Sequence, residues 1–341
     1  MKEIVPLGNG LINDTYLVKT AEGDKADYVL QRINHHIFTD VELLQHNIEV
    51  VTHHLRKKLE AEGTRDIDRR VLRFIPTDTG KTYYYDGESY WRMSIYIDNT
   101  LTVNEVTPQS SYDCGRAFGH FEQQLTDLAE PLGETIPDFH NMELRLRQLR
   151  EAVSNDKAGR LKEVKTEVAL IEAHADEMCL AEQLHREGLL PKRICHCDTK
   201  VNNMLFDREG RVLCVIDLDT VMPAYIFSDY GDFLRTAANS EPEDSPQLDR
   251  IAFRWDIFEA FTRGYLESAG SFLTPVERRH LPFAVALFPF MQATRFLADY
   301  LNGDTYYKTS YADHNLVRTR NQLRLFELVQ ARQQEMTKFT E

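Results

Sequence analysis

The first hundred residues combine stretches of alternating apolar and polar positions with one stretch of helical spacing. The alternating stretches predict β-strands at residues 15–18, 28–32, 71–75, 82–85 and 90–97. The polar residues 22–24 between the first two strands predict a hairpin turn. Apolar residues recur at steps of three and four through residues 44–59, which predicts an amphipathic helix with Asp40 as its N-cap.

Helical spacing dominates the rest of the chain. It predicts helices at residues 112–125, 142–153, 168–187, 253–266, 282–301 and 316–333. One island of short strands and polar loops interrupts these helices at residues 194–220. We therefore expect an α+β fold of two lobes. A small β-rich lobe at residues 1–97 and a larger, mostly helical lobe at residues 98–341 would be joined by a connector near residues 96–101, and ligands often bind between such lobes.

Composition narrows the class of protein. The 341 residues are 42% hydrophobic and 10% aromatic, which is enough to form real cores. The formal net charge of -14 makes nucleic acid and membrane poor partners, although a few local cations and a metal ion can still hold a nucleotide. Apolar stretches such as residues 283–291 are too short and too interrupted to span a bilayer. We see no signal peptide and no regular cysteine framework, so we expect reduced thiols and a cytoplasmic location.

The island at residues 194–220 holds the residues with the clearest chemistry. Asp198 and Asn203 are five positions apart on one polar loop, and Asp217 ends the second of two strands that return the chain beside that loop. Two carboxylates and an amide oxygen that meet at a point can bind Mg²⁺, which prefers oxygen ligands. Phosphoryl transfer needs such a set, because one acid takes the proton of the attacking hydroxyl while the other groups hold metal on the phosphates.

A family resemblance rests on the same island. The order His-x-Asp-x-x-x-x-Asn at residues 196–203, followed by Ile-Asp at residues 216–217, resembles the catalytic loop and metal-binding aspartate of the aminoglycoside phosphotransferase and choline kinase superfamily. That superfamily has a protein-kinase-like fold. Six blocks spread over nearly the whole chain further resemble the N-acetylhexosamine 1-kinases within it. These blocks are residues 8–13, 30–32, 196–203, 216–220, 295–301 and 314–318.

The resemblance assigns roles at the catalytic centre. Asp198 would be the catalytic base, Asn203 and Asp217 would hold Mg²⁺, and Asp219 would be a helper ligand.

The resemblance also assigns residues to the two substrates. Three residues would face a sugar: Asn202, Arg295 and Tyr306. Six residues would bind ATP: Gly8, Asn9 and Gly10 in a glycine turn, Arg32 on a strand, and Tyr96 and Ile97 in the connector. Arg32 stands where protein kinases place a lysine, and Glu49 on the following helix would orient it.

By this resemblance, the reaction would be the ATP- and Mg²⁺-dependent phosphorylation of a free N-acetylhexosamine, GlcNAc or GalNAc, at its anomeric hydroxyl. A carboxylate of modest pKa suffices as base, because an anomeric hydroxyl is more acidic than an ordinary alcohol. Two positions depart from the family pattern, since Leu11 replaces a polar residue and Thr236 an aromatic one. Both would lie near the acceptor, so the preference between epimers stays open.

Simpler explanations exist for some of these residues. Asp198 and Asn203 are ordinary turn residues, and Arg295 and Asp299 are four apart on a predicted helix, where they could pair only with each other. The Cys-His-Cys run at residues 195–197 suggests zinc, but no second ligand pair follows at zinc spacing.

Two other functional classes are alternatives. A kinase of an aminoglycoside or of choline would need acidic or aromatic residues to hold a cation, and Arg295 opposes this. A catalytically inactive nucleotide-binding module would usually lack one of the three key residues. Whichever function applies, we expect structural roles for three further residues. Asp229 and Asp232 would cap a helix and brace the catalytic loop, and His196 would hold that loop by hydrogen bonds.

Overall fold

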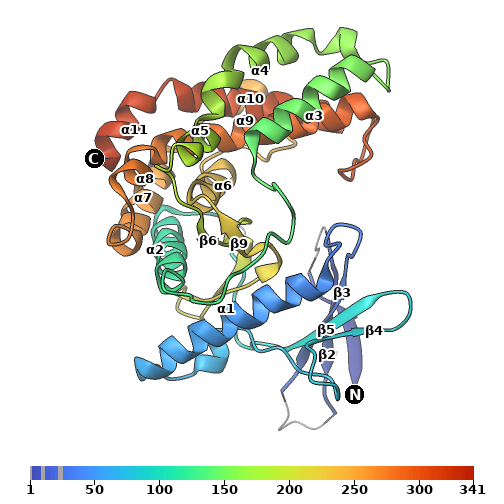
Figure 1. The fold of residues 1–341 in the computed structure, drawn as a ribbon, viewed down its shortest axis with the longest axis vertical. Coiled ribbons are helices and arrows are strands. Elements are labelled where there is room, and N and C mark those ends of the chain that lie inside the picture. The colour runs from blue at the N-terminus through green and yellow to red at the C-terminus, as the bar shows by residue number, and fades with distance from the viewer. Residues whose placement is uncertain (1, 9–11, 22–25, 104) are drawn as a thin grey trace.

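The computed structural model describes residues 2–8, 12–21, 26–103 and 105–341. Its N-terminal part is a five-stranded antiparallel sheet in the order β1-β2-β3-β5-β4, with helix α1 (Val41–Ala61) packed against it (Figure 1). The strands are β1 (Glu3–Pro6), β2 (Asp14–Lys19), β3 (Tyr28–Ile33), β4 (Tyr83–Tyr85) and β5 (Tyr90–Ile95). Ile33 of β3 and Leu44 and Ile48 of α1 are almost fully buried, and they join the sheet to the helix in one apolar cluster.

Most of the local expectations for this part are confirmed. Helix α1 begins directly after Asp40, whose side chain accepts the N–H of Leu43 at 2.9 Å. The expected strand at residues 71–75 is wrong. Strand β4 occupies the edge of β5 at residues 90–92, so the segment pairs with β5 only further along, through an isolated bridge between Phe74 and Ser94. The hairpin turn expected at residues 22–24 lies outside the described residues.

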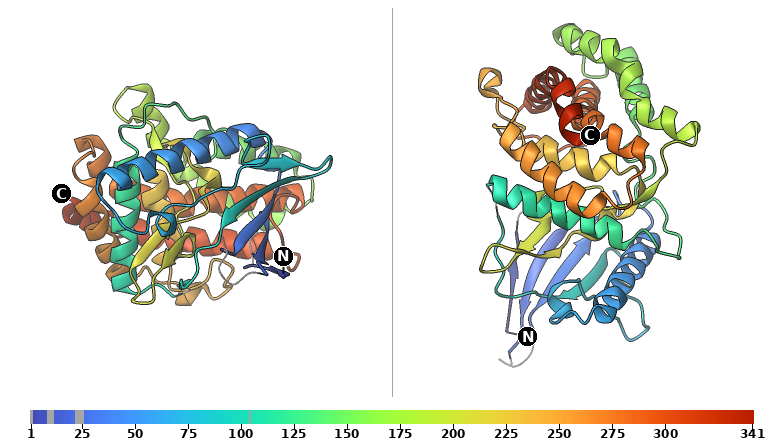
Figure 2. Two further views of the ribbon diagram at one scale, coloured as in Figure 1. Left: turned by 90° about the horizontal axis from the view of Figure 1, so that it is seen from below. Right: turned by 90° about the vertical axis from the view of Figure 1, so that its left-hand side faces the viewer.

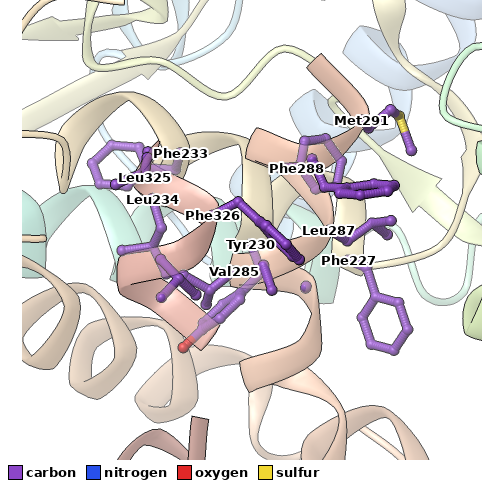
Figure 3. Packing of buried hydrophobic residues seen from close by; sticks show 14 of the residues in the cluster. Phe227, Tyr230, Phe233, Leu234, Val285, Leu287, Phe288, Met291, Leu325 and Phe326 are labelled. Atoms are coloured by element: carbon purple, nitrogen blue, oxygen red, sulfur yellow. The ribbon is translucent and has the colours of Figure 1, made fainter. Parts of the chain in front are cut away.

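Helices dominate the chain after residue 98. They are α2 (Pro108–Gln124), α3 (Met142–Asn155), α4 (Lys165–Met178), α5 (Leu180–Arg186), α6 (Phe227–Ala237), α7 (Trp255–Ala269), α8 (Pro275–Arg279), α9 (Leu281–Asn302), α10 (His314–Gln330) and α11 (Gln333–Thr340). Helix α9 contacts α3, α6 and α10 and forms the centre of this lobe. Figure 3 shows Tyr230 and Phe233 of α6, Phe288 of α9 and Phe326 of α10 in the resulting core.

Four short strands complete the second lobe in two antiparallel pairs. Strand β6 (Arg193–Cys195) pairs with β9 (Met222–Ala224), and β7 (Met204–Phe206) pairs with β8 (Val212–Val215). The β6–β9 pair lies between the N-terminal sheet and the helices (Figures 1 and 2). The expected α+β fold of two lobes is therefore confirmed, while the division at residue 97 stays a prediction.

Two long helical patterns prove to be pairs of helices. The pattern at residues 168–187 divides into α4 and α5 at Cys179, whose N–H bonds to the carbonyl of Asp176 and so tightens the last turn of α4. The pattern at residues 316–333 divides into α10 and α11. Helix α9 is long and apolar enough to cross a membrane, but 83% of its most apolar stretch is buried inside the protein, as in the core helix of a globular domain.

One buried acid predicts a pH dependence of stability. Glu182 of α5 accepts the N–H of Met142 at 2.6 Å, and burial raises its pKa to about 7, from 4.5. Because the unfolded chain loses this proton first, stability falls as pH rises from about 4.5 to 7, by up to about 3 kcal/mol. Glu182→Gln should therefore match the wild type near pH 4.5 and have the higher melting temperature near pH 8. A difference in melting temperature between the two proteins that stays constant across this pH range would contradict the assignment. Glu143→Gln is the control, because Glu143 is paired with Arg186.

Candidate active site

The loop that carries Asp198 follows β6 and is held by Asp229 of α6. The oxygens of Asp229 accept the backbone N–H groups of His196 and Cys197, each at 2.7 Å, and Thr199 donates its hydroxyl to the backbone carbonyl of Asp229 at 2.7 Å. These bonds stabilise an unusual backbone, because Cys197 has a φ of +62°. Asp229 thus braces the loop as expected, although it lies within α6 and does not cap it.

His196 fixes the loop to the strand pair behind it, also as expected. Its Nε2 lies 2.9 Å from the carbonyl oxygen of Ile216, and its Nδ1 accepts the N–H of Asp198 at 3.3 Å. Asp232, the second acid expected to brace the loop, instead pairs with Arg235 at 3.1 Å.

A second buried carboxyl group lies beside Asp229. Burial and the charge of Asp229 raise the pKa of Glu122 well above its usual value, and Glu122 accepts the hydroxyl of Tyr265 at 2.5 Å. The ligand atoms of Glu122, Cys195 and Asp229 lie within 4.8 Å of one another, so among the described residues these three could together bind a metal ion. Asp229 is committed to the catalytic loop and Glu122 to Tyr265, so we interpret the cluster as structural.

Asp198 is half-buried and is held through both carboxylate oxygens. Lys200 lies 2.6 Å from Oδ1, and Asn203 donates from Nδ2 to Oδ2 at 3.1 Å and to the backbone carbonyl at 2.7 Å. Burial alone would raise the pKa of Asp198, but the charge and hydrogen bond of Lys200 outweigh it and hold the pKa below its usual value. The carboxylate is therefore ionised at neutral pH and can accept a proton.

Asp217 follows β8 and lies within electrostatic range of Asp198. Part of Asp217 is open to solvent, yet the protein atoms crowded around its carboxylate and the charges of Asp219 and Asp198 raise its pKa to about 6. It has a φ of +61°, which aims the chain into the short turn formed by residues 218–220. The N–H of Ile216, the residue before Asp217, donates to the carbonyl of Asn203 at 2.9 Å, so Asp198, Asn203 and Asp217 lie on adjoining backbone segments.

These groups fit a divalent cation. The amide nitrogen of Asn203 is committed to Asp198, which leaves its Oδ1 as the amide atom for a metal. The excess of negative charge that raises the pKa of Asp217 is also what a bound cation would relieve. Asp219 differs, because Asn13 donates to its Oδ2 at 2.6 Å and Arg92 lies 2.6 Å from its Oδ1. Its two oxygens are thus already in contact with other protein groups.

The structure does not bring Arg32 to this constellation. Arg32 is half-exposed and donates from Nε to Asp14 at 2.8 Å. Glu49, its expected partner, instead accepts the hydroxyl of Thr82. The pairing expected between Arg32 and Glu49 is wrong, because the two side chains have other partners.

The remaining donor-side residues are placed only in part. Gly8 has a φ of +72°, which suits a glycine turn, whereas Asn9 and Gly10 lie outside the described residues. Tyr96 donates its N–H to the carbonyl of Asp27 at 2.9 Å, and Ile97 is buried. The N–H of Tyr96 is therefore not free for adenine.

Arginine and aromatic residues meet around Arg295, in the region that the resemblance assigns to the acceptor. The guanidinium carbon of Arg295 lies 5.4 Å from the ring centre of Phe139, 6.0 Å from Tyr306 and 5.6 Å from Tyr307. Its Nη1 donates to Gln292 at 3.0 Å. Arg295 and Tyr306 are therefore neighbours, as the sequence suggested.

A second arginine and a histidine join this group without having been expected. Burial, Arg295 and Arg145 lower the pKa of His140, whereas Asp198 raises it. The His140 ring stacks on that of Phe139 with ring centres 4.3 Å apart, and Arg295 lies 5.4 Å from the centre of the same Phe139 ring. Arg145 donates to the backbone carbonyls of Asp138 and Phe139, and burial and the charge of Arg295 lower its pKa to about 10. Within the described part of the chain, neither Arg145 nor Arg295 forms an ion pair with a carboxylate.

Asp299 orders the segment that carries the two tyrosines. It does not pair with Arg295. One of its oxygens accepts the N–H groups of Thr305 and Tyr306, each at 2.9 Å, and the other accepts those of Tyr307 at 3.0 Å and of the Asn315 side chain at 2.9 Å. The backbone of residues 305–307 is therefore fixed by Asp299.

The other acceptor-side expectations are less defined. Asn202 is exposed on the short turn of residues 201–203, and no contact places it beside Arg295. Thr236 is exposed and bonds to the carbonyl of Phe233 at 3.1 Å, while Leu11 lies outside the described residues.

Four further residues of this region went unrecognised in the sequence. They are Arg92, His140, Arg145 and Lys200. Lys200 had a signal, since it stands two positions after the candidate base. Arg92, His140 and Arg145 had none, because their positions depend on packing between distant segments. Asp299 was expected only as a possible partner of Arg295, and its bonds to residues 305–307 were not foreseen.

Comparison with known proteins identifies the family of the chain and its fold. Residues 3–267 match the family model described as APH, the phosphotransferase enzyme family. Among solved structures, an aminoglycoside phosphotransferase from Alicyclobacillus acidocaldarius is similar with a TM-score of 0.63 and 14% identity, over 98% of this chain and 92% of that one. A microcompartment-associated aminopropanol kinase has a TM-score of 0.59 and 16% identity, over 98% and 93%. An amicoumacin kinase in complex with AMP-PNP, Ca²⁺ and Ami has a TM-score of 0.59 and 14% identity, over 95% and 88%.

These likenesses confirm the expected kinase-like fold of two lobes. Because the family model spans most of the chain, the protein belongs to the APH phosphotransferase enzyme family.

Proposed function

We propose that the protein is an ATP-dependent kinase that phosphorylates the anomeric hydroxyl of a free N-acetylhexosamine. The family supports the reaction class, and the sequence blocks that resemble those of N-acetylhexosamine 1-kinases suggest the acceptor. The amicoumacin kinase was solved with an ATP analogue, which supports ATP as donor. A free sugar and ATP meet in the cytoplasm, so the proposal places the enzyme there.

In this proposal Asp198 accepts the proton of the anomeric hydroxyl. Its lowered pKa supports the role, because the base must be ionised before it can act. Lys200 contacts Oδ1 of Asp198, the oxygen that would accept the proton of the acceptor hydroxyl. In this proposal the Lys200 side chain turns towards the transferring phosphoryl group when the sugar binds. Asn203 and Asp217 would hold Mg²⁺, which would neutralise charge on the donor phosphates.

One observation carries the choice of acceptor. Arg145 donates to the backbone carbonyl of Phe139, and Arg295 lies over the ring of the same residue. Neither arginine has a carboxylate partner among the described residues. An aminoglycoside or choline would bring its own positive charge beside them, which costs several kcal/mol in a partly buried site. A neutral acetamido sugar offers carbonyl and hydroxyl oxygens to the arginines, and its CH faces can contact Tyr306 and Tyr307.

A panel of acceptors tests this proposal by coupled ADP detection, with the phosphate position determined by NMR. GlcNAc and GalNAc should turn over at the anomeric oxygen. Glucosamine, which differs from GlcNAc only by the missing acetyl group and the resulting charge, should have a kcat/KM at least about tenfold lower. Kanamycin and choline should be inactive. Turnover of the cationic acceptors without turnover of N-acetylhexosamines would overturn the sugar assignment while leaving the kinase assignment intact.

A further inference from the structure

A neutral residue occupies the face of β3 that points towards α1. Residues 31 and 32 point to opposite faces of the sheet, and the Gln31 side chain is the one that meets residues on the α1 side. Protein kinases carry a lysine on this strand, which pairs with the donor phosphates and with an acid of the following helix. Here the strand offers the amide of Gln31, and α1 offers the amide of Gln45.

The cation comes from the neighbouring strand instead. Arg92 of β5 is the cross-strand partner of Gln31. Its Nε donates to Gln31 Oε1 at 2.9 Å, and its Nη1 donates to Gln45 Oε1 at 3.2 Å. The guanidinium is therefore fixed between the sheet and α1.

Arg92 also crosses to the second lobe. Its Nη1 lies 2.6 Å from Asp219 Oδ1, and the two side chains are only 2% and 4% exposed. Asn13 of the N-terminal lobe donates to the other oxygen of Asp219 at 2.6 Å. Because Asp219 stands two residues after Asp217, these contacts tie the N-terminal sheet to the segment that carries a candidate metal ligand.

We infer that Arg92 is a positioning residue of the phosphoryl-transfer site. Arg92 fixes the segment of residues 217–220 to the N-terminal sheet, and it supplies next to this segment the positive charge that β3 lacks. This inference rests on the proposed function, which puts the donor phosphates at Asp217. It replaces Arg32 as the functional cation of the N-terminal lobe, because Arg32 is half-exposed and paired with Asp14.

Two variants distinguish a role of Arg92 in the phosphoryl-transfer site from a role in stabilising the fold alone. Arg92→Lys keeps the charge but loses the planar fork that reaches Gln31, Gln45 and Asp219 together. Arg92→Met combined with Asp219→Asn removes both charges of the buried pair, and such double replacements often preserve stability where a single one leaves an unpaired charge. The double variant therefore keeps the test usable even where Arg92→Met alone fails to fold.

Calorimetry of ATP binding without acceptor, in Mg²⁺ and then in EDTA, tests the inference. The wild type should bind ATP more tightly with Mg²⁺. In Arg92→Lys and in the double variant the Mg²⁺-dependent affinity should fall roughly 10- to 100-fold, whereas their melting temperatures stay near that of the wild type. Arg32→Met should have the smaller effect.

The outcomes are distinguishable. Absence of Mg²⁺-dependent ATP binding in the wild type would refute the proposed function itself. Normal Mg²⁺-dependent binding in a folded double variant would show that Arg92 only supports the fold. A larger loss in Arg32→Met than in Arg92→Lys would return the role to Arg32.

Discussion

Asp198→Asn should lower kcat by about 10²- to 10⁴-fold while leaving Mg²⁺-ATP binding nearly unchanged. The asparagine has almost the same shape and keeps one oxygen that can accept a hydrogen bond from Lys200 or from Asn203, but it cannot take a proton from the acceptor hydroxyl. Steady-state kinetics give the first quantity, and calorimetry of ATP binding gives the second.

Asp207→Asn is the matched control. Asp207 follows β7 in the same island, and its side chain pairs with Arg211 in the turn before β8. We expect this variant to keep its activity, because Asp207 contacts neither Asp198 nor Asp217. Normal turnover in Asp198→Asn would remove Asp198 from the mechanism, whatever the control shows.

Asp217→Asn should lower both Mg²⁺-ATP affinity and kcat, the latter on the order of 10²- to 10³-fold. An amide carries no charge and is a weaker metal ligand than a carboxylate, so excess Mg²⁺ should restore part of the lost activity. Titration of activity against Mg²⁺ checks this. An unchanged Mg²⁺ dependence would exclude Asp217 as a ligand, and the same titration of Asp198→Asn serves as the comparison, since its half-saturating Mg²⁺ concentration should stay close to that of the wild type.

The local chemistry of the island could be predicted because its parts are close in the sequence. Asp198 and Asn203 share one loop, and a short strand pair is enough to bring Asp217 back to it. The N-cap at Asp40 followed from the same kind of local rule, since a cap needs only the three residues that follow it.

The contacts between lobes could not be predicted in this way. Gln31 and Arg32 are neighbours in the sequence, and which of them meets the arginine of another strand depends on the face that each occupies in the folded sheet. The bond between Asn13 and Asp219 joins positions 206 residues apart. Residues 71–75 have the pattern of a strand, but β4 already occupies the available edge. In each case long-range packing decided the outcome.

The way in which Asp299 holds the segment after α9 has a consequence for how acceptor choice can change. The carboxylate accepts bonds from main-chain groups of residues 305–307, from Asn315 and from the Thr305 hydroxyl, so the side chains at 306 and 307 take no part in the bonds to Asp299. Evolution or engineering can therefore exchange those side chains to suit a different acceptor while the polypeptide course stays the same. Exchanging Asp299 would instead loosen the whole segment at once.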